Sequence, residues 1–228
     1  MYTYTRVLIA LLSLPVGSVL QAADQGQDAV PAGGRGGAAA NVQAGGERDR
    51  DGGIVFFVQS APTHYENVTY GGENDFDSGV RLGLMGVFRG GASKPGDVGF
   101  FGGIGLGYTA YSQVIGPADF TLTEFGLDLQ LGIYMPIAPM FEIQLGMDLG
   151  FGTATAELST AYTSKASDSG TYVLGDFFIR PTLMTKDGFN AYLTLGYQVQ
   201  TATLSYATYD QDLRMSGAYF GAGVGFFF

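Results

Sequence analysis

The chain ends on the stretch AYFGAGVGFFF, residues 218–228. Every second position in it carries an apolar side chain, and most of the positions between are glycine. Strict alternation over a short segment predicts a β-strand with two unlike faces. A soluble strand with one buried face would carry charged or polar side chains on its other face. Here one face is apolar and the other nearly bare, which is typical of a wall between lipid and a tightly filled interior.

Seven further segments with the same alternation lie upstream. In the fifth of the eight, Leu145 and Met147 alternate with Gln144 and Asp148. Helical spacing would mix the two kinds of residue on one stripe, so the pattern favours strands. Before the terminal strand, the predicted strands cover about 53–60, 79–89, 97–112, 119–135, 139–155, 171–184 and 188–204.

The links between these segments differ in length from one side to the other. The links at 136–139 and 185–188 are tight turns, whereas most of the others are longer and more polar, near 61–78, 112–118, 156–170 and 205–213. Short turns at one end and long loops at the other are typical of a closed antiparallel up-and-down transmembrane β-barrel. We therefore predict an all-β barrel of eight strands. The link at 90–96 is long for a turn on the short side, so ten strands remain the alternative.

The first part of the chain has a different character. Arg6 precedes an apolar stretch at 7–20, and Leu-Gln-Ala at 20–22 offers a small-residue cleavage site. This pattern predicts a secretory signal peptide over residues 1–22. Residues 23–52 are rich in glycine and alanine and hold almost nothing that could be buried, which predicts a disordered periplasmic leader. The barrel domain is then expected to span 53–228.

Composition narrows the possible partners and the means of stabilisation. The chain has no cysteine, so an exported protein of this size needs another way to hold its structure, and a closed barrel provides one. Its net charge of −10 argues against nucleic acid as a partner. The mean hydropathy of +0.16 fits a chain in which only alternate residues face lipid.

The signal peptide, the alternating strands and the terminal aromatic residue together resemble the small bacterial outer-membrane β-barrels of the OmpA, OmpX or OmpW type. The resemblance covers roughly residues 53–228. It implies a place in the outer membrane of a Gram-negative-type bacterium, contact with outer-membrane lipid and lipopolysaccharide, and reading of the last strand by the barrel-assembly machinery. The assembly signal would then fall on Phe220, Ala222, Val224, Phe226 and Phe228.

The chain departs from this resemblance in having no tryptophan, which usually shares the membrane interfaces with tyrosine. Tyrosine and phenylalanine must serve instead. We expect Tyr108, Phe120 and Phe151 near the outer rim, and Tyr134, Phe141, Phe189 and Phe228 near the inner one.

The alternation also places seven ionisable residues inside the predicted barrel. An eight-stranded barrel leaves only enough interior for side chains, and an arginine facing lipid near the midplane would cost about 2–4 kcal/mol. We interpret these residues as a polar network that fills and rigidifies the lumen. A gated, narrow conduit for small or apolar solutes is the alternative interpretation. The seven residues are Arg81, Glu124, Asp128, Glu142, Asp148, Asp176 and Arg180.

Architecture alone does not specify a function, because barrels of this size include adhesins, anchors, conduits and enzymes. We expect a structural or surface-interaction role, with the links near 61–78 and 156–170 as the place for an extracellular ligand. The conduit is the second hypothesis. A lipid-modifying enzyme is the third, and it would have to use His64, the single histidine, with Ser60 the nearest serine. No metal-ligand spacing is present, and the sequence indicates no cofactor.

Overall fold

A computed structural model describes residues 51–92, 94–160, 163–205 and 210–228. The predicted signal peptide and nearly all of the predicted leader lie outside these residues. Within them, no helix is long and apolar enough to cross a bilayer. The described chain forms the strands β1 (Gly52–Ser60), β2 (His64–Asn67), β3 (Glu73–Asp75), β4 (Ser78–Gly90), β5 (Gly99–Ile115), β6 (Ala118–Ala138), β7 (Phe141–Thr160), β8 (Thr163–Met184), β9 (Phe189–Ser205) and β10 (Asp210–Phe227).

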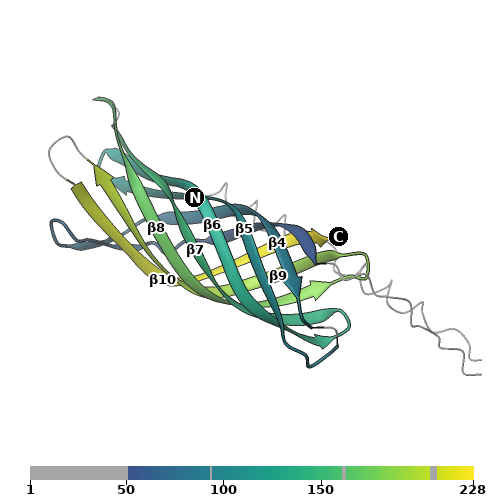
Figure 1. Cartoon of the computed structure of the whole chain (residues 1–228). Helices are drawn as coiled ribbons and strands as arrows, with labels where there is room; N and C mark the ends of the chain where they lie inside the picture. Colours follow the sequence, from purple (N-terminus) through teal and green to yellow (C-terminus); the bar gives the residue numbers. More distant parts are fainter. Residues whose placement is uncertain (1–50, 93, 161–162, 206–209) are drawn as a thin grey trace, which may run out of the picture. The chain divides into compact units, whose positions relative to one another are not determined.

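Eight of these strands close into a ring (Figure 1). Neighbours pair antiparallel in the order β1, β4, β5, β6, β7, β8, β9 and β10, and the ring closes where β1 pairs with β10. The closing ladder runs from Gly53 opposite Phe227 to Gln59 opposite Gly221. The prediction of an eight-stranded up-and-down barrel is therefore confirmed. The ten-strand ring is wrong, because the long link after β4 leads directly to its neighbour β5.

The two strands outside the ring form a hairpin. β2 pairs with β3, and it also pairs with β10 from Asn67 opposite Leu213 to Tyr65 opposite Met215. The first long link, predicted as a loop near 61–78, thus contains a hairpin that extends the wall of the barrel. β10 has 18 residues and β1 only 9, so part of β10 extends beyond β1 and takes the hairpin as its neighbour. We call this end of the barrel the loop end, and the end that holds Phe228 the C-terminal end.

The strands at the loop end are also longer than predicted. The link expected near 156–170 is largely strand, because β7 continues to Thr160 and β8 begins at Thr163. Most residues there are small or polar, with Leu158 and Tyr162 as the large exceptions, so the regular apolar alternation on which the prediction depended is missing. Threonine still favours strands, and the ladder continues. Figure 1 shows β8 extending far along the loop end.

The outer surface of the ring is a band of exposed apolar side chains. Phe100, Leu131 and Phe177, for example, are 67, 59 and 68 % exposed. Soluble proteins seldom expose a contiguous apolar surface of this extent, so the band is suited to hydrocarbon. The residues predicted to face outward on the strands do so. Two of the aromatic residues predicted at the rims were placed wrongly. Tyr134 is 3 % exposed and faces the lumen, since it shares the parity of Gln130, and Phe120 packs against the interior cluster at the loop end.

Two glycines let β6 and β7 approach each other closely inside the barrel. Gly126 lies opposite Gly152 in the ladder. A Cβ built on Gly152 would lie 2.2 Å from the carbonyl oxygen of Phe125 and 2.5 Å from the Cα of Gly126. Both contacts are with backbone, which cannot move aside without disturbing the ladder. The close approach therefore requires glycine at this position.

We expect Gly152→Ala to destabilise the folded barrel by about 1–3 kcal/mol, the usual cost of overpacking. The measurement is urea-induced unfolding in lipid vesicles. Gly175→Ala is the matched control, because its Cβ would meet only the side chain of Leu149 at an ordinary 3.8 Å. Equal stability of the two variants would contradict the close approach of β6 and β7.

Candidate functional site

The loop-end half of the lumen is filled by apolar side chains. Twelve buried residues form one cluster there, and Phe76, which follows β3, lies in it with its ring 4.8 Å from that of Tyr111. Leu122, Leu174 and Leu204 in the same cluster are 0 % exposed. The segment of the β2–β3 hairpin that extends the wall therefore also contributes a side chain to the apolar cluster inside the barrel. The full cluster is Ala61, Phe76, Tyr111, Leu122, Ala154, Ala156, Tyr172, Leu174, Ala202, Leu204, Leu213 and Met215.

Below this cluster lie the polar residues that the alternation placed inside. The structure buries all seven, with exposures between 1 and 6 %. It links six of them into three separate groups of hydrogen bonds and leaves Asp176 apart. The seven are Arg81, Glu124, Asp128, Glu142, Asp148, Asp176 and Arg180.

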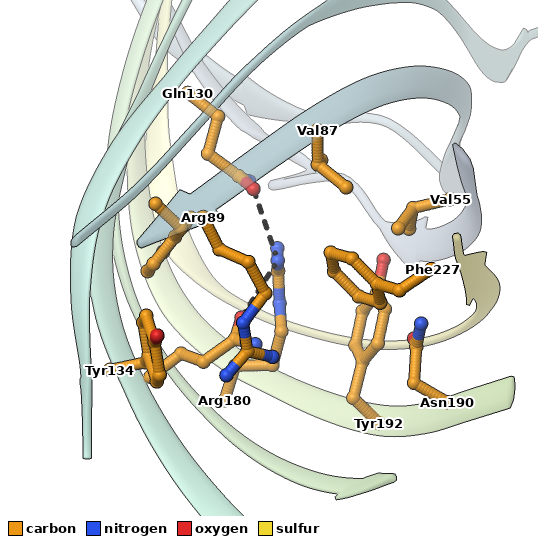
Figure 2. Close-up of a pocket in the computed structure, with 11 residues that line it drawn as sticks. Val55, Val87, Arg89, Gln130, Tyr134, Arg180, Asn190, Tyr192 and Phe227 are labelled. Carbon is orange, nitrogen blue, oxygen red and sulfur yellow. Dashed lines mark hydrogen bonds between the residues drawn. The ribbon is translucent and has the colours of Figure 1, made fainter. Parts of the chain in front are cut away.

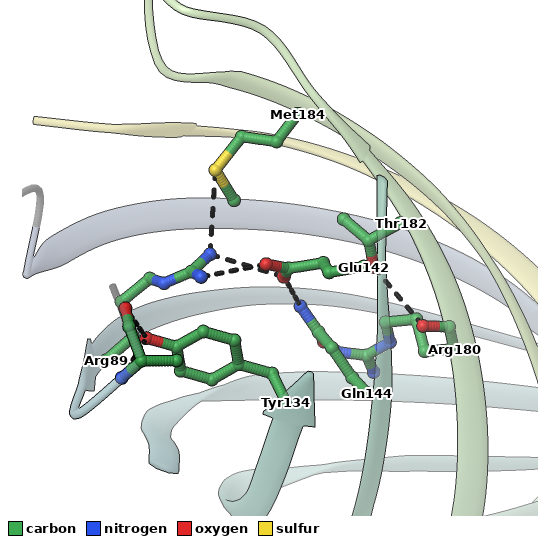
Figure 3. Close-up of polar contacts among 8 residues, drawn as sticks. Arg89, Tyr134, Glu142, Gln144, Arg180, Thr182 and Met184 are labelled. Carbon is green, nitrogen blue, oxygen red and sulfur yellow. Dashed lines mark hydrogen bonds and ion pairs between the residues drawn. The ribbon is translucent and has the colours of Figure 1, made fainter. Parts of the chain in front are cut away.

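The longest group extends from Asp148 to Arg89, and Figure 3 shows its part formed by Arg180, Gln144, Glu142 and Arg89. Gln130 donates to Asp148 at 2.8 Å, and Arg180 donates to the side-chain oxygens of Gln130 and Gln144 at 3.2 and 3.4 Å. Gln144 then donates to Glu142 at 2.8 Å. Glutamine can donate and accept at once, so it relays contacts between charged groups that are too far apart to pair directly.

Arg89 completes this group near the C-terminal end of the lumen. Its guanidinium donates to both carboxylate oxygens of Glu142, at 2.8 and 3.2 Å, and lies 3.9 Å from the centre of the Tyr134 ring. Arg180 is held in a similar way, 4.2 Å from the ring of Phe178 and 4.3 Å from that of Tyr192. Such stacking fixes the planar cations as well as their charges.

The other two groups lie nearer the apolar cluster. Arg81 forms an ion pair with Asp128 in which both side chains are at most 2 % exposed. Gln200 donates to Glu124, accepts from Gln198 at 2.9 Å and accepts from the hydroxyl of Tyr111 at 3.3 Å. The last contact joins these polar side chains to the apolar cluster at the loop end, to which Tyr111 belongs.

Asp176 is the exception among the predicted residues. It lies between Asp148 on β7 and Gln198 on β9 in the ladder, yet neither carboxylate oxygen has a hydrogen-bond partner among the described residues. The ladder therefore places Asp176 opposite another acidic residue, and no salt bridge of Asp176 is found among the described residues.

Sequence reasoning did not assign Arg89 to the lumen, and it placed the glutamines on the inward faces without predicting that they join the charged groups. Arg89 was detectable, because it follows Arg81, Met85 and Val87 at even spacing on the inward face of β4. The predicted strand, about 79–89, contained Arg89, but the side chain of this last residue was not assigned to a face. With Arg89 included, the lumen holds three arginines against five carboxylates, and the amides Gln130, Gln144, Gln198 and Gln200 connect them.

A small cavity lies beside Arg89 and Arg180 near the C-terminal end of the lumen (Figure 2). It leaves about 20 Å³ for the centre of a water molecule, which is room for a single water. Val55, Val87 and Phe227 line one side of it, opposite Arg89 and Arg180. The volume is too small for an organic substrate.

His64 and Ser60 do not form a nucleophile and base pair. His64 faces acidic side chains, with Nδ1 2.9 Å from an Asp75 oxygen and Nε2 3.9 Å from a Glu73 oxygen. The Ser60 hydroxyl instead donates to the backbone oxygen of Phe220 at 3.3 Å and accepts from its N–H at 3.1 Å. Among the described residues, no group of three or more His, Cys, Asp or Glu side chains is arranged to hold a metal ion.

The residues predicted to form the assembly signal lie on the outer surface of the terminal strand. Phe220, Phe226 and Phe228 are 56, 49 and 68 % exposed, and Val224 lies on the same face. Their placement is compatible with reading by another protein from outside the barrel. The assembly signal itself stays a prediction.

No family model and no curated protein matches the chain. Among solved structures, the chain is similar to Ail, the attachment invasion locus protein of Yersinia pestis, in complex with the heparin analogue sucrose octasulfate: 16 % identity, TM-score 0.42, covering 77 % of this chain and 99 % of that one. Neisserial surface protein A is 14 % identical with a TM-score of 0.45, and the match covers 78 % of this chain and 97 % of that one. The Pseudomonas putida toluene transporter TodX is 8 % identical with a TM-score of 0.22, and the match covers 78 % of this chain and 90 % of that one. With TM-scores below 0.5, the fold assignment rests on the closed ring itself.

We expect Arg81→Met to destabilise the barrel by about 3–5 kcal/mol, because it leaves the buried Asp128 carboxylate without its cation. Urea-induced unfolding in lipid vesicles measures the change. The double variant Arg81→Met/Asp128→Leu should recover most of the loss, since both partners are then apolar. A double variant no more stable than the single one would show that the unpaired Asp128 carboxylate does not cause the loss of stability.

Proposed function

We propose that the protein is a sealed barrel of the bacterial outer membrane with a structural or surface-interaction role. The apolar band would face the lipid, and the loop end would face the outside of the cell. The filled lumen is the observation that carries this proposal. It supports a barrel that acts through its outer surface and its loop end.

The filling is continuous from one end to the other. An ion or solute would have to displace the apolar cluster at the loop end, then the ion pair of Arg81 and Asp128, and then the stacked Arg89 and Arg180. Removing buried charged groups from their partners costs several kcal/mol for each pair. The narrow conduit is therefore the less supported hypothesis.

The loop end offers the larger surface for a partner. The β2–β3 hairpin and the long ends of β7 and β8 all extend beyond the apolar band (Figure 1). These elements include both regions expected to hold an extracellular ligand, near 61–78 and 156–170. A lipid-modifying activity has less support, because His64 pairs with Asp75 and Glu73 and not with a nucleophile.

A planar-bilayer recording tests the sealed lumen. We expect the purified full-length protein to insert and to give no discrete conductance steps, because three layers of side chains would have to move together. A porin reconstituted in parallel shows that the assay detects a channel. Stable unitary steps that scale with protein concentration would overturn the proposal in favour of a conduit.

The absence of cysteine allows the topology to be tested by single labels. We expect Glu73→Cys, in the exposed hairpin, to react with a membrane-impermeant maleimide on intact cells. Lys186→Cys, in the exposed turn between β8 and β9, should react only after the outer membrane is permeabilised. The reverse labelling pattern would place the loop end on the periplasmic side.

A further inference from the structure

The small cavity near the C-terminal end of the lumen is lined by positive charge alone (Figure 2). The charged side chains in its lining are Arg89 and Arg180, and none of the residues that line it is acidic. Glu142 and Asp148 belong to the same hydrogen-bonded group but do not line the cavity. The cavity is therefore suited to an anion and not to a cation.

Arg180 has no carboxylate partner, although it is only 6 % exposed. It donates to the hydroxyl of Thr194 at 3.2 Å and to the side-chain oxygens of Gln130 and Gln144 at 3.2 and 3.4 Å, and all three acceptors are neutral. Among the described residues no salt bridge of Arg180 is found, whereas the other two arginines of the lumen each form one. A buried guanidinium without a counter-ion is costly, and an anion beside it would offset that cost.

Two further donors line the cavity beside Phe227 (Figure 2). The side-chain nitrogen of Asn190 and the hydroxyl of Tyr192 are buried, and neither has a hydrogen-bond partner among the described residues. Buried polar groups are almost always hydrogen-bonded, so two unpartnered donors at one cavity indicate a ligand that accepts hydrogen bonds there.

The size of the cavity limits the ligand. It leaves about 20 Å³ for the centre of a water molecule, which excludes phosphate, sulfate and carboxylates. A halide ion is only slightly larger than water and fits. A water molecule would bring two protons of its own to a lining rich in donors, whereas a halide only accepts and also supplies the negative charge that Arg180 lacks.

We propose that this cavity binds one chloride ion, held by the guanidinium of Arg180, the side-chain amide of Asn190 and the hydroxyl of Tyr192. The valine and phenylalanine side chains in the rest of the lining keep competing water away. Arg89 is the one lining residue that is not fully buried, so the ion would exchange past it from the C-terminal end. The site adds a ligand to the lumen and does not rest on the function proposed above.

Urea-induced unfolding of the purified protein in lipid vesicles tests the site, with chloride replacing gluconate at constant ionic strength. Gluconate is too large for the cavity, and constant ionic strength keeps general screening the same. Because the ion is released on unfolding, we expect the unfolding equilibrium constant to fall about tenfold for each tenfold rise in chloride above its dissociation constant. Equal stability in the two salts would overturn the proposal, and the cavity would then hold water.

Tyr192→Phe should weaken chloride binding at least about tenfold, because it removes a donor to the anion and keeps the ring that stacks on Arg180. Tyr219→Phe is the matched control, since its hydroxyl is also buried in the lumen but does not line the cavity, and it should keep the wild-type chloride dependence. An unchanged chloride dependence in Tyr192→Phe, or an equal loss in the control, would overturn the site.

Bromide keeps the proposal testable if heat-modifiable mobility on gels shows that Tyr192→Phe does not fold. Crystals of the wild-type protein grown in bromide should give an anomalous scattering peak in the cavity, within hydrogen-bond distance of Asn190. A cavity without such a peak would refute the assignment.

Discussion

Closure of the hydrogen-bond ladder between β1 and β10 is the constraint on which the other features depend. A strand edge left open in hydrocarbon would expose backbone groups that lipid cannot satisfy, at several kcal/mol each. The seam removes that edge over the span from Gly53 to Gln59, and the β2–β3 hairpin covers the next part of β10. Once the ring is closed, each strand has one face for lipid and one for the lumen. The apolar band and the filled interior are consequences of that division.

The interior follows from the small circumference of the ring. Eight strands leave space for side chains and little else, so each charged group admitted to the lumen must find its partners there. Glutamines allow Asp148, Arg180 and Glu142 to share one chain of hydrogen bonds, and aromatic rings hold the guanidinium planes. Polar side chains that would destabilise the barrel if they faced lipid thereby fill its interior. A lumen filled with side chains in this way directs attention to the outer surface and the loops.

The sequence predicted the ring well because its signal is simple. Every transmembrane strand must alternate with period two, and residues such as Leu145 and Gln144 report their face directly. The same parity would have found Arg89, had the predicted strand been considered to its end. The β2–β3 hairpin and the upper parts of β7 and β8 lie beyond the hydrocarbon, where water can face both sides of a strand and no alternation is required. The partners within the lumen were unpredictable for another reason. Parity fixes which side chains enter the interior, but the register and rotamers decide that Arg81 pairs with Asp128 and that the described residues give the Asp176 carboxylate no hydrogen-bond partner.

The β2–β3 hairpin has a consequence for how the surface of this protein can change over evolution. Loops of outer-membrane proteins usually vary freely, because they carry little of the stability of the barrel. Here the first loop supplies Phe76 to the interior cluster and pairs through Tyr65 with β10, so its sequence is constrained as strongly as that of a strand. On the topology proposed above, selection from outside the cell would meet a first loop that tolerates little change, and variation would concentrate at the remaining tips. In the turn between β5 and β6, a Cβ built on Gly116 would meet no heavy atom within 4 Å, so this turn is a permissive place for insertions.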